Sequence, residues 1–256
     1  MRISRKAWNN YISLLRAIND KAASELVTWM NINGGDGLLN VDIRDSNGNN
    51  IIDAAYLIAQ KYGDASAAVS AQMYEAIAEL SGVYIPPAEL EPSPTYGEVA
   101  KTVQGVLKTS QNREEISSAV GRLVKQTGAR TTRRNARRDG AQFAWIPSGD
   151  TCAFCIMLAS NGWMNARKAD HKDHIHSNCD CTYAVRFNEY TQVAGYEPEK
   201  YREQYDNAEG SNYKEKLNSM RRRYYAENRE DILSQKISAS EKRAELNASS
   251  AEETKV

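Results

Sequence analysis

The sequence predicts a mainly α-helical protein: an N-terminal helical region, a small α+β knuckle that carries cysteines, and a charged tail that is helical or partly disordered. Three observations support this class. Apolar residues recur at three- and four-residue steps through most of residues 1–128, which is the period of amphipathic helices. Cysteine and histidine are confined to residues 152–181, and strand-like segments flank them. The final part of the chain, residues 196–256, is charged and rich in tyrosine.

The composition narrows the function classes. Lys plus Arg and Asp plus Glu both total 33, so the net charge indicates neither a nucleic acid nor an acidic substrate. The N-terminus lacks the apolar stretch of a signal peptide, and no stretch approaches the roughly 18 apolar residues of a membrane span. We therefore expect a protein made in a reducing cytoplasm, with no membrane partner. In such a compartment, four cysteines favour metal binding over disulfides.

The first helix is predicted over residues 4–30, where Trp8, Ile12 and Leu15 begin an apolar stripe at helical spacing. The Asn33-Gly34-Gly35 sequence is expected to end this helix. The turn-rich stretch that follows, residues 41–52, is predicted to be a plain turn within a short hairpin.

A second helix is predicted over residues 54–80, with an interruption at Gly63-Asp64. Several prolines near residues 84–96 indicate a linker. Helical patterning then resumes over residues 99–107 and 116–124. We place the end of the helical region at residue 128.

The cysteines and histidines of residues 152–181 follow the order C-x-x-C, three histidines, then C-x-C. Zinc takes four thiolate or imidazole ligands at tetrahedral angles, and short ligand pairs are easily organised around one ion. We predict a zinc site in this segment. The predicted ligands are Cys152, Cys155 and His176, together with one or both of Cys179 and Cys181.

The ligand set leaves alternatives open. Cys179 and Cys181 point the same way in an extended strand, which permits an all-cysteine site. His171 and His174 lie in a hydrophilic run and are expected to be exposed. Reduced cysteines with coincidental spacing, or a disulfide pair, would also account for the pattern.

The segments on either side of the cysteines predict the architecture of the knuckle. Residues 141–146 and 182–187 are strand-like, and Asp150 or Thr151 is expected to cap a short helix that carries the first cysteine pair. Trp145 and Phe187 are expected in its core.

Donors exceed the four positions of a tetrahedral ion, and no general-base motif accompanies them, so we expect a structural zinc and no enzyme activity. One enzymatic alternative is a zinc-knuckle nuclease of the HNH kind, because Asp173-His174-Ile175 resembles part of that motif. The downstream residues that would complete the motif are absent.

A basic stretch precedes the knuckle, and at helical spacing its arginines share one face. Five guanidinium groups on one face suit a polyanion such as DNA; the alternative is a solvated face or one that pairs with acidic residues elsewhere. The candidate DNA-binding residues are Arg130, Arg133, Arg134, Arg137 and Arg138. A second cluster, residues 221–225, has acidic neighbours and is expected to be a solvated helix.

Residues 145–160, W-I-P-S-G-D-T-C-A-F-C-I-M-L-A-S, together with residues 176–181, H-S-N-C-D-C, resemble the MuF-like minor head proteins of tailed bacteriophages. Those proteins carry C-x-x-C followed by H-x-x-C-x-C, commonly as H-P-N-C-R-C. This chain departs from that pattern at Ser177 and Asp180. The C-D-C variant and residues 61–65, K-Y-G-D-A, look like the versions in phages of Gram-positive hosts. The specific match covers residues 145–187, with weaker similarity over 54–145.

The resemblance implies a module at residues 129–195 that consists of the basic helix and the zinc knuckle. It also implies a low-copy head protein, made in the bacterial host cytoplasm and located inside the capsid. Its expected partners are the portal and the major capsid protein, and its expected role is head assembly, DNA packaging or DNA ejection. Packaged DNA would then be the partner of the arginine face. A host-encoded DNA-binding regulator is a less favoured alternative.

Overall fold

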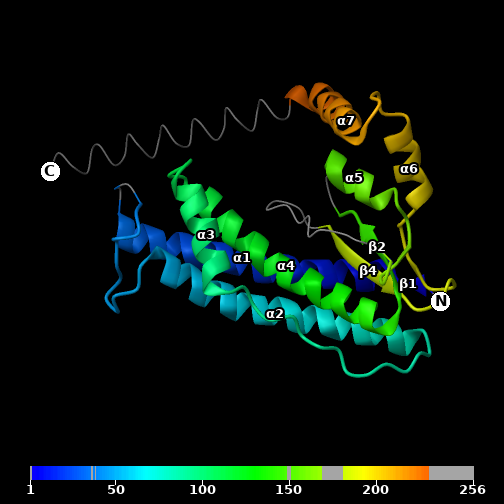
Figure 1. Cartoon of the computed structure of the whole chain (residues 1–256), viewed down its shortest axis with the longest axis horizontal. Coiled ribbons are helices and arrows are strands. Elements are labelled where there is room, and N and C mark those ends of the chain that lie inside the picture. Colours follow the sequence, from blue (N-terminus) through cyan, green and yellow to red (C-terminus); the bar gives the residue numbers. More distant parts are fainter. Residues whose placement is uncertain (1, 36, 38, 149–150, 169–180, 231–256) are drawn as a thin grey trace.

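The computed structural model describes residues 2–35, 37, 39–148, 151–168 and 181–230. This part of the chain is mainly helical, with a small sheet. Figure 1 shows helices side by side as an elongated layer, with the sheet at one end and further helices beyond the sheet. None of the helices in the described ranges has the length and apolar character needed to cross a lipid bilayer.

The long helices are α1 (Arg5–Gly34), α2 (Ile51–Leu80), α3 (Tyr96–Leu107) and α4 (Arg113–Asp139). Each begins at a polar residue whose side chain accepts a backbone N–H of the first turn: Ser4, Asn50, Thr95 and Asn112. The Asn50 and Thr95 caps are reciprocal capping boxes with Asp53 and Glu98. These four capping residues determine where the bundle helices begin.

One prediction about the first half of the chain was wrong. The Gly63-Asp64 sequence does not interrupt α2, and Gly63 provides room for the Ser93 side chain, whose Oγ would lie 2.4 Å from an added Cβ. The predicted turn near residues 41–52 is present, and the hairpin around it is a single bridge between Arg44 and Asn50. Asp45 closes this turn by accepting the N–H groups of Asn47 and Asn49.

Helix α4 runs without a break across the position where we placed the end of the helical region. Its first half packs among α1, α2 and α3, and its second half reaches the sheet. The expected boundary between residues 128 and 129 therefore falls inside one continuous helix. The basic stretch belongs both to the bundle and to the knuckle.

The closest helix packing in the bundle occurs between α2 and α4 at small residues. Gly128 of α4 faces Ser66 and Ser70 of α2, and an added Cβ at Gly128 would lie 2.5 Å from the Ser66 Oγ and 3.0 Å from its carbonyl oxygen. Both serines are buried. Glycine at this position thus lets the two helices approach to a distance that any larger residue would prevent.

The proline-rich residues 83–94, here called the strap, run back along α2 and α4 toward α3 (Figure 1). The buried Asn135 of α4 pairs with both backbone groups of Glu89, accepting its N–H at 2.9 Å and donating to its carbonyl at 2.8 Å. Further hydrogen bonds join the strap to neighbouring helices: Ala88 N–H to Glu75, Glu91 N–H to Thr131, Ser93 Oγ to Asp64, and Gln60 Nε2 to the Pro94 carbonyl. The predicted linker is therefore fixed against the bundle along its length.

The knuckle contains a three-stranded antiparallel sheet with strand order β3 (Met164–Asn165), β2 (Gln142–Ile146), β4 (Thr182–Arg186). Strands β2 and β4 confirm the two predicted strands, whereas the short β3 was not predicted. Helix α5 (Ala153–Ala159) contacts β2, and α6 (Pro198–Asp206) and α7 (Tyr213–Glu227) pack on α5. The helical part of the predicted tail is thus found in α6 and α7, while residues 231–256 lie outside the described residues.

Two apolar cores stabilise the molecule. One lies in the middle and far half of the bundle, around Leu26, Ile58 and Val120. The other joins the near ends of α1, α2 and α4 to the sheet and to α5, and it includes the buried Trp145. Phe187 packs edge-on against Tyr74 of α2, with ring centroids 5.4 Å apart. Both aromatic residues that were predicted for the knuckle core therefore contribute to packing.

The last residue of α4, Asp139, ties this helix to α2. Its carboxylate accepts the Tyr74 hydroxyl at 2.7 Å and two guanidinium bonds from Arg138 at 2.8 and 2.9 Å. Burial opposes ionisation, but the hydrogen bonds from Arg138 and Tyr74 outweigh it and lower the pKa of Asp139.

Asp139→Asn is expected to destabilise the protein at neutral pH and to weaken its acid sensitivity. Because the folded pKa of Asp139 is below the unfolded value of about 3.9, its stabilisation is present above that pH and is lost as the pH falls through the folded pKa. Urea unfolding between pH 7 and pH 2.5 tests this. Equal slopes of stability against pH below pH 4 in both proteins would contradict the prediction.

Candidate metal centre and arginine surface

Strand pairing places Cys181 at the end of the β2–β4 ladder. Ile146 and Thr182 form the last pair of the register. Cys181 directly precedes Thr182, so it lies beside the residues that follow Ile146 at the end of β2. Its sulfur is buried and accepts the backbone N–H of Ser148 at 3.4 Å. A hydrogen bond of this type stabilises a thiolate and orients it, as the outer shell of a metal site does.

The C-x-x-C pair is located at the first turn of α5. Cys152 is the N-cap residue and is exposed, whereas Cys155 is in the first turn and fully buried. The N-cap and third helical positions lie at the same end of a helix, so both sulfurs belong to this end of α5. Asp150 and Thr151 were predicted as caps; the N-cap is Cys152 itself, and its side chain makes no capping hydrogen bond.

Three of the five predicted ligands, Cys152, Cys155 and Cys181, are thus described by the structure. His176 and Cys179 lie outside the described residues, as do His171 and His174. Within the described ranges, no three His, Cys, Asp or Glu side chains form a group that could hold a metal ion. Thiols are ligands that zinc prefers, but the described residues do not bring Cys152, Cys155 and Cys181 together as such a group, so the zinc site stays a prediction.

Two of the five predicted DNA-binding arginines face the strap and bind it. Arg134 pairs with Glu89 at 2.9 Å and with Glu91 at 3.5 Å. Arg138 donates to the carbonyl oxygens of Pro86 and Pro87 at 3.0 and 2.9 Å. These guanidinium groups therefore hold the strap against α4. For Arg134 this is the alternative stated above, in which the basic face pairs with acidic residues elsewhere in the chain.

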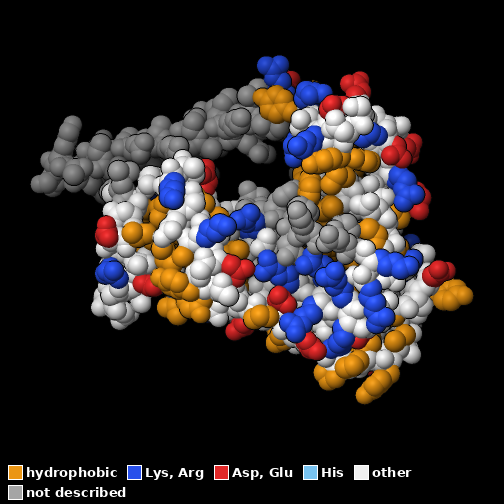
Figure 2. Space-filling model, in the orientation of Figure 1, with side chains coloured by type: hydrophobic (Ala, Val, Ile, Leu, Met, Phe, Trp, Pro, Cys, Tyr) orange, Lys and Arg blue, Asp and Glu red, His pale blue; other side chains and the backbone are white. Residues whose placement is uncertain are grey.

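The other three arginines lie on the adjoining side of α4. Arg130 pairs with Glu98 of α3 at 3.7 Å, and Arg133 is partly exposed. Arg137 is exposed and donates to the Ala166 carbonyl at 3.2 Å. Figure 2 shows Lys and Arg side chains gathered over the middle of this face with a few Asp and Glu among them, and the ion pairs of Arg130 and Arg134 neutralise part of the basic face.

An arginine that was not singled out, Arg167, caps the C-terminus of α4. Its guanidinium donates to the carbonyl oxygens of Arg137 and Arg138 at 3.1 and 2.8 Å. A cation at this position also interacts favourably with the negative end of the helix dipole. Arg167 follows the knuckle strand β3, so this contact joins the knuckle to the bundle.

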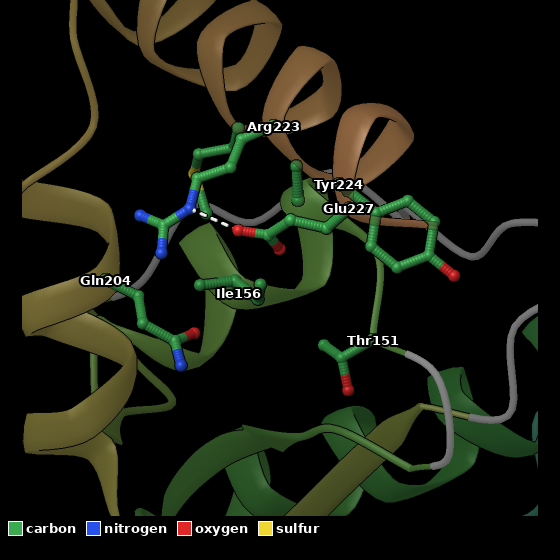
Figure 3. A pocket seen from close by; sticks show the side chains of 8 residues that line it. Thr151, Ile156, Gln204, Arg223, Tyr224 and Glu227 are labelled. Atoms are coloured by element: carbon green, nitrogen blue, oxygen red, sulfur yellow. Dashed lines mark hydrogen bonds and ion pairs between the residues drawn. The ribbon is translucent and has the colours of Figure 1, made fainter. Parts of the chain in front are cut away.

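Helices α5, α6 and α7 enclose an open pocket of about 240 Å³ beside Thr151 (Figure 3). Glu227 is the one carboxylate among the described lining residues, and Arg223 binds it at 2.9 Å. This i,i+4 pair confirms the intrahelical pairing predicted for the second arginine cluster. The paired carboxylate is a weak candidate for a general base.

Some contacts of this region were not predictable from the pattern of ligands. The Ser148 N–H to Cys181 bond follows from strand register, which the sequence does not state. The acidic partners of the arginines had a visible signal: Glu89 and Glu91 alternate in an extended proline-rich segment that could lie along the basic helix.

Comparison with known proteins gives one match. A family model described as VG15 protein matches residues 2–208, which extend from β1 (Arg2–Ile3) to just beyond α6. No curated protein and no solved structure matches the chain. Helix α7 lies beyond the matched range.

Proposed function

Because the chain belongs to the VG15 protein family, a viral family of phages, we propose that it is a minor head protein of a tailed phage. In this proposal it is associated with the portal inside the head and assists head assembly, DNA packaging or DNA ejection. It is made in the host cytoplasm, and its zinc is structural.

The observation that carries the proposal is the agreement between the family match and the cysteine motif. The C-x-x-C pair and the C-x-C pair both lie within residues 2–208, the range that the phage family model matches. These are the residues on which the resemblance to MuF-like head proteins depends. The first pair begins α5 and Cys181 directly precedes β4.

The proposal is tested on purified phage particles. Quantitative mass spectrometry of virions and of procapsids should detect the chain at a few copies per particle, and far below the major capsid protein. A phage with the gene disrupted should give heads that lack DNA or fail to eject it, and the intact gene supplied in trans should restore infectivity. Absence of the chain from both particles, with normal infectivity of the disrupted phage, would overturn the proposal.

The zinc site has its own prediction. After exhaustive dialysis the protein should retain about one zinc per chain, because four tetrahedral ligands bind the ion tightly. Cys152→Ser combined with Cys155→Ser should remove it, and His171→Ala is the matched control that should keep it. Elemental analysis measures the ratio. A wild-type ratio near zero in protein purified without chelator would contradict the prediction.

We also propose that packaged DNA contacts α4 through Arg133, which is partly exposed, and Arg137, which is exposed. Arg133→Ala with Arg137→Ala should weaken binding to duplex DNA and flatten its dependence on salt concentration by about two phosphate contacts. Lys216→Ala with Lys214→Ala, on α7, is the control pair of matched charge. Sequence-specific binding that persists at moderate salt would instead favour a regulator.

One assay distinguishes a nuclease from a structural protein. Supercoiled plasmid incubated with the protein and Mg²⁺ or Mn²⁺ should remain intact. Metal-dependent nicking that His174→Ala abolishes would show an enzyme and contradict the structural role.

A further inference from the structure

The end of α2 and the strap form an apolar patch on the surface, defined here as Leu80, Val83, Tyr84, Pro86 and Pro87. Tyr84 is 96% exposed and Leu80 is 50% exposed. Figure 2 shows hydrophobic side chains gathered at the lower right edge of the molecule, where Figure 1 places the end of α2 and the strap. Exposed apolar residues that cluster in this way mark interaction sites more often than isolated ones do.

The backbone beneath the patch is rigid. Helix α2 ends with Gly82 in the left-handed conformation (φ 65°), and the Val83 N–H returns to the Ala78 carbonyl at 3.0 Å. Arg138 then binds the carbonyl oxygens of Pro86 and Pro87, and Glu75 accepts the Ala88 N–H. The polar groups of this backbone are thus directed toward the bundle while the Tyr84 side chain projects into solvent. An extended segment fixed in advance loses little conformational entropy when it binds.

The charged residues near the patch along the chain are acidic, and the arginine that lies beside it in space, Arg138, is paired with Asp139 and Glu89. Between Lys61 and Lys101 the sequence contains acidic residues and no lysine or arginine. Glu75 and Glu79 are exposed on the last turns of α2, beside the patch. An apolar partner surface with basic residues at its edge would complement this arrangement, and a second copy of the same acidic patch would not.

From this rigid aromatic segment and its acidic surroundings, we infer that the apolar patch is a docking site for another protein. That protein presents an apolar cleft edged by lysine or arginine. The proline-rich segment enters the cleft with Tyr84 as its anchor, in the manner of other extended proline-rich ligands. Leu80 and Val83 lie against the cleft wall, and Glu79 faces its basic edge.

The test uses the full chain and two defined probes, the portal protein and the major capsid protein of the same phage, each purified alone. The choice of probes rests on the proposed function. One of the two should bind, Tyr84→Ser should weaken binding roughly 10- to 30-fold, and Glu79→Lys should slow association several-fold at low salt. Tyr213→Ser, an exposed tyrosine of α7, is the matched control and should change nothing. All variants should melt as the parent chain does, because these side chains are exposed.

A photo-crosslinking amino acid at position 84 identifies the contacted surface. Crosslinks to an apolar cleft with basic neighbours support the inference. Binding by neither probe, binding unchanged by Tyr84→Ser and Glu79→Lys, or crosslinked dimers of the chain itself would each overturn it. Binding that survives both substitutions leaves the proposed head role intact, whereas absence from the particles removes that role, so the two failures are distinguishable.

Discussion

Replacing Asn135 with alanine is expected to lower the free energy of unfolding by about 2–3 kcal/mol and the melting temperature by roughly 5–10 °C. Asn135 is fully buried, and its amide pairs with both the N–H and the carbonyl of Glu89 and also donates to the Thr131 carbonyl at 2.8 Å. Alanine leaves these backbone groups without their partners and opens a small cavity between α4 and the strap. Chemical denaturation with urea measures the loss.

The isosteric change Asn135→Asp separates hydrogen bonding from packing. It keeps the volume but places a carboxylate against two carbonyl oxygens, so it should be more destabilising than alanine at pH 7. Lower pH should restore part of the stability, because a protonated carboxyl donates one bond again. Asn218→Ala, at an exposed position of α7, is the matched control and should shift stability by less than about 0.5 kcal/mol. An Asn135→Ala protein as stable as this control would show that the strap contributes nothing to the fold.

Gly128→Ala is expected to destabilise the protein by about 1–3 kcal/mol, and Gly128→Val by more. The added Cβ would lie 2.5 Å from the Ser66 Oγ and 2.6 Å from the Ser70 Oγ, and the Ser66 carbonyl oxygen at 3.0 Å cannot rotate away. Helix α4 would have to move away from α2, which would separate the pair of helices with the most extensive packing. Thermal melting followed by circular dichroism reports the change.

The control for Gly128 is another helical glycine. Gly105 of α3 has no atom within 4 Å of an added Cβ, so Gly105→Ala should stabilise the protein by about 0.5–1 kcal/mol through helix propensity alone. Ser66→Ala combined with Gly128→Ala should recover part of the loss, since it removes the nearest atom. If both glycine substitutions stabilised the protein equally, close packing of α2 on α4 would be disproved.

The sequence predicted those elements of the fold whose signals are local. Apolar periodicity located the long helices, and capping residues such as Asn50 and Thr95 fixed where they begin. Contacts between distant segments determined the rest. Gly63 resembles a helix breaker in isolation, and only the Ser93 side chain lying against it shows that the glycine allows close packing within a continuous helix. Likewise, only the three-dimensional contacts show that Arg134 and Arg138 bind the strap.

The candidate metal centre was predictable in its cysteines and not in its surroundings. The expected cap at Asp150 or Thr151 predicted a short helix that carries Cys152 and Cys155, and the structure has α5 beginning there with Cys152 as the N-cap. The N–H group that Ser148 directs at Cys181 depends on the register of β2 and β4, which the composition of either strand does not specify. The role of His176 and Cys179 stays a prediction.

The parallel pairing of β1 with β5 (Gln192–Val193) has a consequence for synthesis. Residues 2 and 3 are translated long before their strand partners, residues 192 and 193. At about 5–20 residues per second, the ribosome needs roughly 10–40 s to deliver those partners, and Ile3, buried in the finished protein, stays uncovered throughout. The helices of the bundle can form locally during this interval, whereas closure of the knuckle on the N-terminus is a late event of high contact order. Bulky insertions directly before β1 are therefore expected to impair closure of the knuckle.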